Sequence, residues 1–371
     1  MTPALAALVL MLSAGVALAD DAAGLTIPVA LAPFDAKAPL CAKPPGLSRI
    51  LGFAEDNRRD FMLGVASGLI KAAADRGLTY QRMLADNDPA LMAKQIRDFA
   101  AAKVGAVVVA PIDAAKSASA LQQVIRGGAY VAAIVPPPAT TILNAPQYLT
   151  GKVLGDDAVD YIVKHLNGRA NVVLLTHDGL EFLAPRFAAI RDALRKLPDV
   201  TIVADISPET VDRAGGTATM QTILLAEPQI DVVLGADTVV LGALDAMRSA
   251  GKARPNQYFG GIDGEADALA EIAIPGSPYK TTVSLAAPIF GYALGQYAAD
   301  WLDGKSVPQA MDILPAALNM DNLVRYQDDT ADPGAIWADP ARRDRYLKMY
   351  GNICYDTRDR YLNFAWSSEN R

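Results

Sequence analysis

The sequence contains few side chains that are typical of catalysis. Its two histidines are His165, within an expected helix, and His177, directly after an expected strand. Neither lies in an H-E-x-x-H metal motif, and no G-x-S-x-G elbow, Walker sequence or Rossmann glycine fingerprint is present. His177 and Asp178 could form an acid/base pair at a strand end, but ordinary structural histidines are the simpler interpretation. The sequence therefore predicts a protein that is not an enzyme and needs no cofactor.

A second group of chemically suggestive residues is acidic. Asp328, Asp329 and Asp332 precede Gly334 and resemble part of a calcium loop, in which closely spaced oxygen atoms bind the ion. Pro333 stands where the sharp turn of such a loop needs glycine. We therefore expect a solvated acidic turn here and no metal site.

Two cysteines and the first twenty residues give information about the compartment. An apolar run from Ala4 to Ala17 ends in an A-x-A pattern at Ala19, which is typical of a cleaved secretory signal peptide. The alternative is a retained membrane anchor, which needs roughly 20 apolar residues. Export to an oxidising compartment favours a disulfide between Cys41 and Cys354 over two buried thiols.

Composition limits the size of the core and the class of partner. The chain has 371 residues, of which 51% are hydrophobic, so it can bury one large core or two medium ones. The formal net charge is −7 and no basic block is present, which argues against a nucleic-acid partner.

From Ser48 onward, short continuous apolar runs alternate with longer amphipathic stretches, a pattern that predicts buried parallel strands and crossover helices. The expected strands are Arg49–Phe53, Leu78–Leu84, Val104–Ala110, Tyr130–Val135, Asn171–Thr176, Thr201–Asp205, Asp231–Gly235, Tyr258–Ile262 and Thr281–Leu285. The expected helices are Phe61–Arg76, Ala114–Gly127, Asp157–Leu166, Ala184–Leu197, Gly216–Ala226, Thr238–Ala250, Pro288–Leu302 and one that begins after Asp88 as N-cap.

Two shifts in composition mark boundaries. The proline-rich stretch from Pro136 to Pro146 separates two sets of strands, so a lobe boundary is expected there. After about Arg325 the strand and helix alternation stops, and aspartate, arginine, tyrosine and tryptophan become frequent. We interpret this end as a packed tail that Cys354 joins to the N-terminal arm.

An ordered series of short motifs runs from Ser48 to Leu323. The series is Ile50-Leu51-Gly52-Phe53, Asp60-Phe61 with Gly68, Asp86-Asn87-Asp88-Pro89, Val107 to Asp113, Asp237 before Leu241-Gly242-Ala243-Leu244, and Gly260-Gly261-Ile262-Asp263-Gly264. In this order and spacing, the motifs resemble those of the type I periplasmic sugar-binding proteins, the group that includes the ribose- and galactose-binding proteins.

The resemblance implies an α/β fold of two doubly wound parallel-sheet lobes joined by a three-segment hinge. It places the hinge segments near Val135–Pro136, Leu285–Ala286 and Leu314–Pro315, with the ligand between the carboxyl ends of both sets of strands. The expected divisions are a signal peptide (1–19), an N-terminal arm (20–47), an N-terminal lobe (48–135 plus 286–314), a C-terminal lobe (136–285 plus 315–325) and a C-terminal extension tied to the arm (326–371).

Three charged residues match ligand-binding positions of that family. Asp113 follows a buried strand and could accept two hydroxyl hydrogen bonds, although it could instead cap the helix that starts at Ala114. Arg186 opens a helix of the second lobe and could donate a bidentate pair of hydrogen bonds, with surface solvation as the alternative. Asp263 lies between glycines at a strand end, where it could bind ligand or only shape the turn.

The first loop offers further candidates. Asp56, Asn57 and Arg59 occupy a region where relatives provide polar contacts, and surface solvation is the alternative for Arg59. Phe61 could stack on the apolar face of a sugar, or it could be the first core residue of its helix.

Other positions depart from the ribose pattern. Ala236 replaces an asparagine, Leu285 replaces a hinge glutamine, and Gly151-Lys152 replaces an Asp-Asn pair, so ribose is not the expected ligand. The resemblance implies a monomeric periplasmic protein that captures a sugar, polyol or sugar acid and delivers it to a membrane ABC permease. The alternative is a periplasmic sensor that reports its ligand to a membrane histidine kinase or chemoreceptor.

Overall fold

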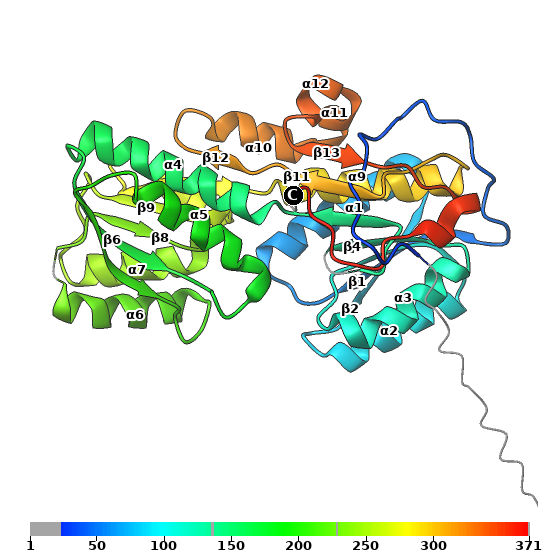
Figure 1. The fold of residues 1–371 in the computed structure, drawn as a ribbon, viewed down its shortest axis with the longest axis horizontal. Helices are drawn as coiled ribbons and strands as arrows, with labels where there is room; N and C mark the ends of the chain where they lie inside the picture. Colours follow the sequence, from blue (N-terminus) through cyan, green and yellow to red (C-terminus); the bar gives the residue numbers. More distant parts are fainter. Residues whose placement is uncertain (1–23, 135–136, 228, 370–371) are drawn as a thin grey trace, which may run out of the picture.

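The computed structural model describes residues 24–134, 137–227 and 229–369, which form two lobes side by side (Figure 1). The first lobe contains a sheet of β1 (Ser48–Glu55), β2 (Thr79–Leu84), β3 (Val104–Val109), β4 (Tyr130–Ile134), β5 (Thr141–Asn144), β11 (Ala310–Ile313) and β13 (Leu347–Tyr350). Its strand order is β13-β11-β5-β4-β3-β1-β2, and all neighbours are parallel except β11 and β13.

The second lobe contains β6 (Ala170–Leu175), β7 (Val200–Ile206), β8 (Val232–Leu234), β9 (Tyr258–Asp263), β10 (Tyr279–Ser284) and β12 (Ala316–Leu318). The order is β12-β10-β9-β8-β6-β7, and only the edge strand β12 is antiparallel to its neighbour. The expected α/β architecture of two parallel-sheet lobes is confirmed.

Helices cover both sheets. The first lobe carries α1 (Asp60–Arg76), α2 (Pro89–Ala101), α3 (Ala114–Arg126) and α9 (Ala287–Leu302), and the second carries α4 (Gln147–His165), α5 (Ala184–Leu194), α6 (Arg213–Ala226), α7 (Asp237–Ser249) and α8 (Ala266–Ile272). Near the C-terminus follow α10 (Leu323–Ala331), α11 (Pro333–Ala338) and α12 (Pro340–Arg343). Short 3-10 turns lie at Glu181–Leu183 and Tyr355–Arg360.

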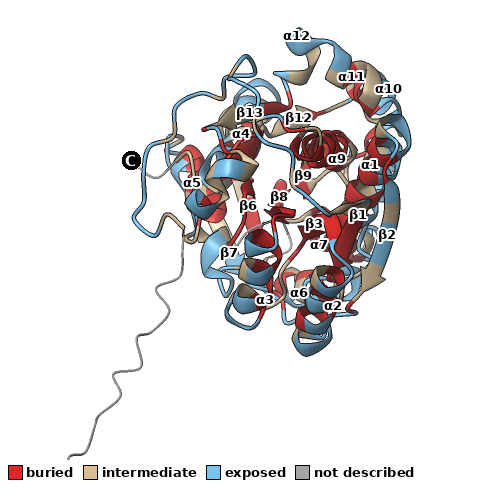
Figure 2. Cartoon of the chain, turned by 90° about the vertical axis from the view of Figure 1, so that its right-hand side faces the viewer, coloured by how far each residue is buried: buried red, intermediate tan, exposed pale blue. Residues whose placement is uncertain are grey.

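Local sequence explains several of these elements. All six residues of β3 are buried, as expected for a strand covered on both faces. Asp88 caps α2 by accepting hydrogen bonds from the N–H groups of Ala90 at 2.8 Å and Leu91 at 3.1 Å, which confirms the predicted N-cap. Buried residues concentrate in the strands and in α9 (Figure 2). One apolar cluster fills the first lobe, and two clusters fill the second.

The chain passes between the sheets at three places. After β10 it crosses at Leu285–Ala286, and after β11 it crosses at Leu314–Pro315, as the resemblance implied. The first crossing was expected at residues 135–136, which lie outside the described residues. The buried strand Thr141–Asn144 pairs with β4, so the chain stays in the first lobe until about residue 145. The proline-rich surroundings concealed this four-residue strand.

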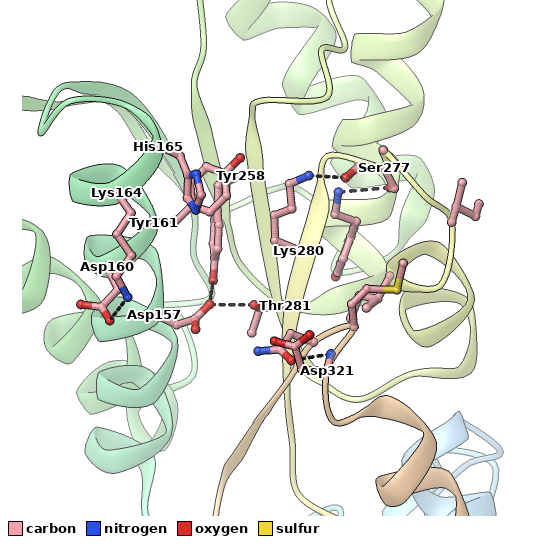
Figure 3. A pocket seen from close by; sticks show the side chains of 16 residues that line it. Asp157, Asp160, Tyr161, Lys164, His165, Tyr258, Ser277, Lys280, Thr281 and Asp321 are labelled. Carbon is pink, nitrogen blue, oxygen red and sulfur yellow. Dashed lines mark hydrogen bonds and ion pairs between the residues drawn. The ribbon is translucent and has the colours of Figure 1, made fainter.

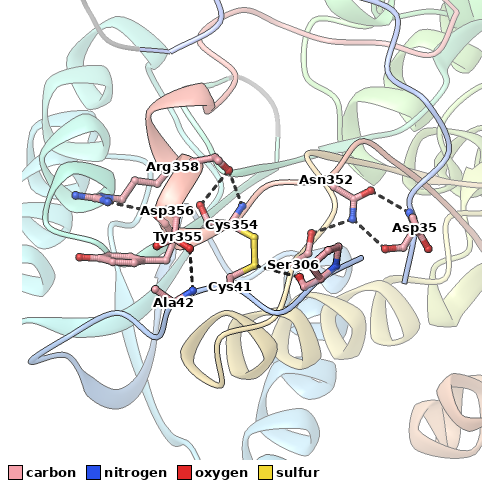
Figure 4. Close-up of a disulfide and its surroundings, with 11 residues drawn as sticks. Asp35, Cys41, Ala42, Ser306, Asn352, Cys354, Tyr355, Asp356 and Arg358 are labelled. Carbon is pink, nitrogen blue, oxygen red and sulfur yellow. Dashed lines mark hydrogen bonds between the residues drawn. A yellow bond between two sulfur atoms is a disulfide. The ribbon is translucent and has the colours of Figure 1, made fainter. Parts of the chain in front are cut away.

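The arm and the C-terminal segment are joined as predicted. Cys41 and Cys354 form a disulfide with a Cα–Cα distance of 5.7 Å (Figure 4). Beside it, the backbone N–H of Ala42 donates to Asp356 Oδ2 at 2.8 Å. The expected signal peptide lies outside the described residues, and no helix among the described residues is long and apolar enough to cross a membrane.

Candidate ligand-binding site

The carboxyl ends of the parallel strands of both sheets point toward the boundary between the lobes. β10 of the second sheet continues through Leu285 and Ala286 into α9, which packs on α1 in the first lobe. β11 of the first sheet continues through Leu314 and Pro315 into β12 of the second. The parallel neighbours of β10 and β11 end at the same boundary. Because open α/β sheets bind ligands at this edge, the loops here form the candidate site.

The loop between β1 and α1 presents a polar cluster. The buried carboxylate of Asp56 accepts a hydrogen bond from Arg59 Nη2 at 2.9 Å. Asn57 Nδ2 donates to Asn87 Oδ1 at 2.9 Å, so the loop after β2 supports the loop after β1. Burial raises the pKa of Asp56, while the Arg59 guanidinium opposes this rise. The cluster therefore contains one balanced charge pair.

Asp113 lies at the carboxyl end of β3 and caps α3. Its Oδ1 accepts a hydrogen bond from the backbone N–H of Lys116 at 3.0 Å, and Lys116 Nζ lies 3.4 Å from Oδ2. The backbone hydrogen bond is the main reason that the pKa of Asp113 is lowered. The capping role considered from the sequence is present, and 34% of the side chain remains exposed.

Phe61 packs against the first-lobe core. Its ring lies 5.5 Å from the ring of Phe290 in α9, centroid to centroid, and the side chain is only partly buried. This contact corresponds to the second alternative for Phe61, in which it is the first core residue of its helix.

In the second lobe, Arg186 is held in a buried position. The residue is 7% exposed, and its Nε donates to Gln147 Oε1 at 2.9 Å. Its Nη1 lies 3.8 Å from Asp263 Oδ1. Burial lowers the pKa of Arg186, and the Asp263 carboxylate opposes that change. The structure thus brings two of the predicted site residues together and leaves the solvated alternative for Arg186 without support.

Gly151 explains how Arg186 is positioned. It lies on α4, and a Cβ atom at this position would be 1.8 Å from the backbone oxygen of Arg186 on α5. A larger residue would therefore separate the two helices. Helix packing therefore requires the small residue at Gly151.

Asp263 occupies a backbone conformation that is rare for residues other than glycine. Its φ is 120°, and strained backbone of this kind concentrates at functional sites. The turn that follows is held by other residues. Asp237 Oδ2 accepts a hydrogen bond from the N–H of Glu265 at 2.8 Å, and Thr282 Oγ1 accepts one from the N–H of Gly264 at 3.1 Å. The carboxylate of Asp263 is consequently not used to shape the turn.

Asp237 belongs to one of the sequence motifs but was not predicted as a residue of the site, and its role is structural. It is fully buried, and its carboxyl oxygens accept hydrogen bonds from Tyr279 Oη at 2.7 Å and from Thr282 Oγ1 at 2.7 Å. Burial, reinforced by the charge of Asp263, raises the pKa of Asp237 to about 7. Burial, together with the charges of Asp237 and Asp263, raises the pKa of Glu265 to about 8.

Charged groups from both lobes act on Asp263. Burial raises its pKa, while the guanidinium groups of Arg186 and of Arg59 in the first lobe lower it. Arg59, Arg186 and Asp263 therefore share one electrostatic environment across the lobe boundary. Among the described residues, no hydrogen bond or ion pair links Asp113 or Phe61 to this group.

The alternative chemical groups have structural roles. Asp178 forms an ion pair with Arg191, whose Nη2 lies 2.6 Å from Asp178 Oδ2. The partner of this carboxylate is therefore Arg191 and not His177. Asp329 is buried and accepts hydrogen bonds from Arg342 and Tyr346. Within the described residues, no cluster of three or more His, Cys, Asp or Glu side chains could hold a metal ion.

Two cavities lie away from the lobe boundary. One, of about 500 Å³, lies beside α4 near the amino ends of β9 and β10 (Figure 3). In its wall, Asp157 Oδ2 accepts hydrogen bonds from Tyr258 Oη and Thr281 Oγ1, both at 2.6 Å. The other, of about 570 Å³, lies between the arm and the C-terminal segment beside Phe34 and Trp337. Neither contains a predicted site residue.

Comparisons with known proteins agree with this geometry. Residues 53–306 match the model of the periplasmic binding protein domain. The chain is 26% identical over 259 residues to the ribose import binding protein of Bacillus subtilis, which covers 68% of this chain and 80% of that protein. It is 24% identical over 309 residues to the galactofuranose-binding protein of Escherichia coli, covering 76% and 88% of the two chains.

Solved structures share the fold. A solute-binding protein of Bacillus halodurans with bound myo-inositol has a TM-score of 0.65 at 20% identity, covering 76% of this chain and 98% of that one. A solute-binding protein of Actinobacillus succinogenes with bound D-allose has a TM-score of 0.66 at 18% identity, covering 75% and 99%.

Proposed function

The chain belongs to the periplasmic binding protein family, and from this premise we propose that it captures a neutral sugar or polyol between its lobes. The proposed first lobe spans 48–144 and 286–314, and the proposed second lobe spans 146–285 and 315–325. The carrying observation is the grouping of Arg59, Arg186 and Asp263 at the facing carboxyl ends of the two sheets. Asp56, Asn57, Phe61 and Asp113 complete the proposed site.

The charge distribution favours a neutral ligand over a sugar acid. Arg59 is already paired with Asp56, and Arg186 faces Asp263, so neither guanidinium lacks a carboxylate partner. A carboxylate ligand would have to compete with these internal pairs. Hydroxyl groups, in contrast, can accept from the guanidinium and donate to the carboxylate of the same pair.

Reversible capture would serve uptake through a membrane ABC permease. The ribose import relative and the solved transporter proteins favour uptake over the sensory alternative. Membership of the family supports a periplasmic location, with residues 1–19 as the proposed cleaved signal peptide and the monomer as the proposed form.

The proposal is tested by a thermal-shift screen of sugars, polyols and sugar acids on the mature protein, followed by calorimetry on the best ligand. Asp263→Asn suits this test because asparagine tolerates positive φ better than alanine does. A hydrogen bond to a charged group contributes about 1.5–3 kcal/mol, so the affinity should fall by roughly ten- to hundred-fold. If Asp263→Asn and Arg186→Lys bound the ligand with the affinity of the wild type, the proposed location of the binding site would be refuted.

Asp113 needs a separate design because it also caps a helix. Asp113→Ser retains a good N-cap but removes the carboxylate, so it separates stability from binding. We expect an unchanged melting temperature and weaker binding of the screened ligand. Asp339→Ser is the matched control, because Asp339 also caps a helix, α12, and is not among the proposed site residues. If Asp113→Ser bound the ligand as tightly as the control does, Asp113 would be only a cap.

A further inference from the structure

The segment after β12 extends beyond the family match, which ends at residue 306. We call residues 319–369 the C-terminal strap. The strap's middle part is fixed to the first lobe: β13 pairs with β11, and Cys354 is bonded to Cys41 of the arm. Trp337 packs its ring 5.3 Å from that of Tyr297 on α9. This part of the strap must therefore move with the first lobe.

The beginning of the strap spans both lobes. In α10, the side chain of Leu323 lies in an apolar cluster of the second lobe, whereas Tyr326 lies in the cluster of the first lobe. The two residues are separated by a rise of only about 4.5 Å along the helix. A helix of this kind cannot stretch, so the two cores cannot separate freely at this point. Tyr326 Oη also contacts Ser284 Oγ, directly before the second crossing.

The end of the strap reaches the second lobe again. The carboxylate of Glu369 accepts hydrogen bonds from the N–H groups of Leu149 at 2.7 Å and Tyr148 at 3.1 Å, in the first turn of α4. No side chain at the N-cap position Pro146 serves this helix end, so Glu369 takes that role. α4 begins directly after the first crossing and packs on α5 in the second lobe.

The strap also binds the third crossing. The N–H of Leu314 donates to the backbone oxygen of Tyr346 at 2.8 Å. Each of the three crossings is thus in contact with the strap or adjacent to a residue that is. Rotation of the lobes about the crossings must disturb either the α10 bridge or the Glu369 cap.

We propose that the C-terminal strap is a fourth connection between the lobes and limits how far they open. In the ligand-free protein it keeps the lobes within a narrow range of separations. Release of its two second-lobe contacts widens that range. The proposal concerns the ligand-free protein and does not depend on which ligand binds.

Double electron–electron resonance on the ligand-free mature protein tests this proposal. Spin labels on noncanonical residues at the exposed positions Leu91 of α2 and Leu225 of α6 report the lobe separation and leave the disulfide intact. We expect Glu369→Ala and Leu323→Ala to shift the distance distribution to longer values and to broaden it, with the largest effect in the double variant.

Two matched controls separate lobe opening from general loosening. Asn352→Ala removes a strap residue with several hydrogen bonds, but its partners are Asp35 and Ser306, away from the second lobe (Figure 4). Leu78→Ala removes a similarly buried leucine from the first-lobe core, outside the strap. Both controls should keep the wild-type distribution. If the double variant also keeps it, or if the controls broaden it equally, the proposal is overturned.

Discussion

The buried carboxyl of Asp237 gives a prediction that can be worked out in detail. Asp237→Asn replaces an acid by an amide of the same shape, and an amide resembles the protonated carboxyl. The amide oxygen can accept from the N–H of Glu265 and from Thr282 Oγ1, and the amide NH2 can donate to the hydroxyl of Tyr279, which then acts as acceptor. The variant therefore removes the titration while it preserves the turn that presents Asp263.

Because the pKa of Asp237 is raised, its contribution to the free energy of unfolding falls as the pH rises. The pKa of Asp237 is about 7 in the folded state against 3.8 for an ordinary aspartate, so the folded protein binds more protons than the unfolded chain between these values. The stabilisation from this group is complete below pH 3.8 and is lost as the pH rises through 7. Between pH 5 and 8 the loss amounts to roughly 2–3 kcal/mol.

Urea unfolding of the wild type and of Asp237→Asn at pH 5, 6, 7 and 8, at constant ionic strength, measures this effect. The variant should have the higher free energy of unfolding throughout, and its advantage over the wild type should widen by about 2–3 kcal/mol between pH 5 and pH 8. Glu265 also has a raised pKa, to which the charge of Asp237 contributes, so Glu265→Gln in both backgrounds removes its titration from the difference. A difference that is the same at pH 5 and pH 8 would refute the reasoning.

Three further predictions concern stability. Gly151→Ala should lower the free energy of unfolding by about 1–3 kcal/mol or more, measured in urea, because its Cβ would collide with the backbone oxygen of Arg186. Cys41→Ser with Cys354→Ser should lower the melting temperature, and the chain-entropy model for a separation of 313 residues sets an upper limit of roughly 5–6 kcal/mol. Asp329→Ala should lower the free energy of unfolding in urea by about 1–3 kcal/mol because it removes the acceptor of the buried Tyr346 hydroxyl, and millimolar calcium should not change the melting temperature of the wild type.

Much of the fold could be predicted because buried parallel strands leave a strong local signal. The continuous apolar run at Val104–Val109 is an example, and its six residues are all buried. Four short strands, Thr141–Asn144, Ala310–Ile313, Ala316–Leu318 and Leu347–Tyr350, were missed, and two of them show the physical reason. Thr141–Asn144 lies among prolines, and Leu347–Tyr350 pairs with a strand more than thirty residues away, so neither has enough length for a periodic pattern.

The site could be predicted only in part. Asp263 and Arg186 were predicted from the resemblance, and the structure places Arg186 Nη1 3.8 Å from Asp263 Oδ1. Asp237 had a signal, since an aspartate directly after a buried strand opens a helix. Its role remained hidden because its hydroxyl donors, Tyr279 and Thr282, come from a different strand. Local sequence cannot report which strands become neighbours in space.

Asp237, Asp263 and Glu265 differ in their pKa values and in their partners, and these differences affect which ligands suit this loop. At neutral pH a substantial fraction of Asp237 and most of Glu265 carry a proton, since their pKa values are about 7 and about 8. Burial raises the pKa of Asp263, and the guanidinium of Arg186, whose Nη1 lies 3.8 Å from Asp263 Oδ1, opposes this rise. Arg186 and Asp263 are thus paired at this strand end. A ligand with a net charge of either sign would leave one partner of this pair uncompensated in a buried place, whereas a polyhydroxylated neutral ligand satisfies both.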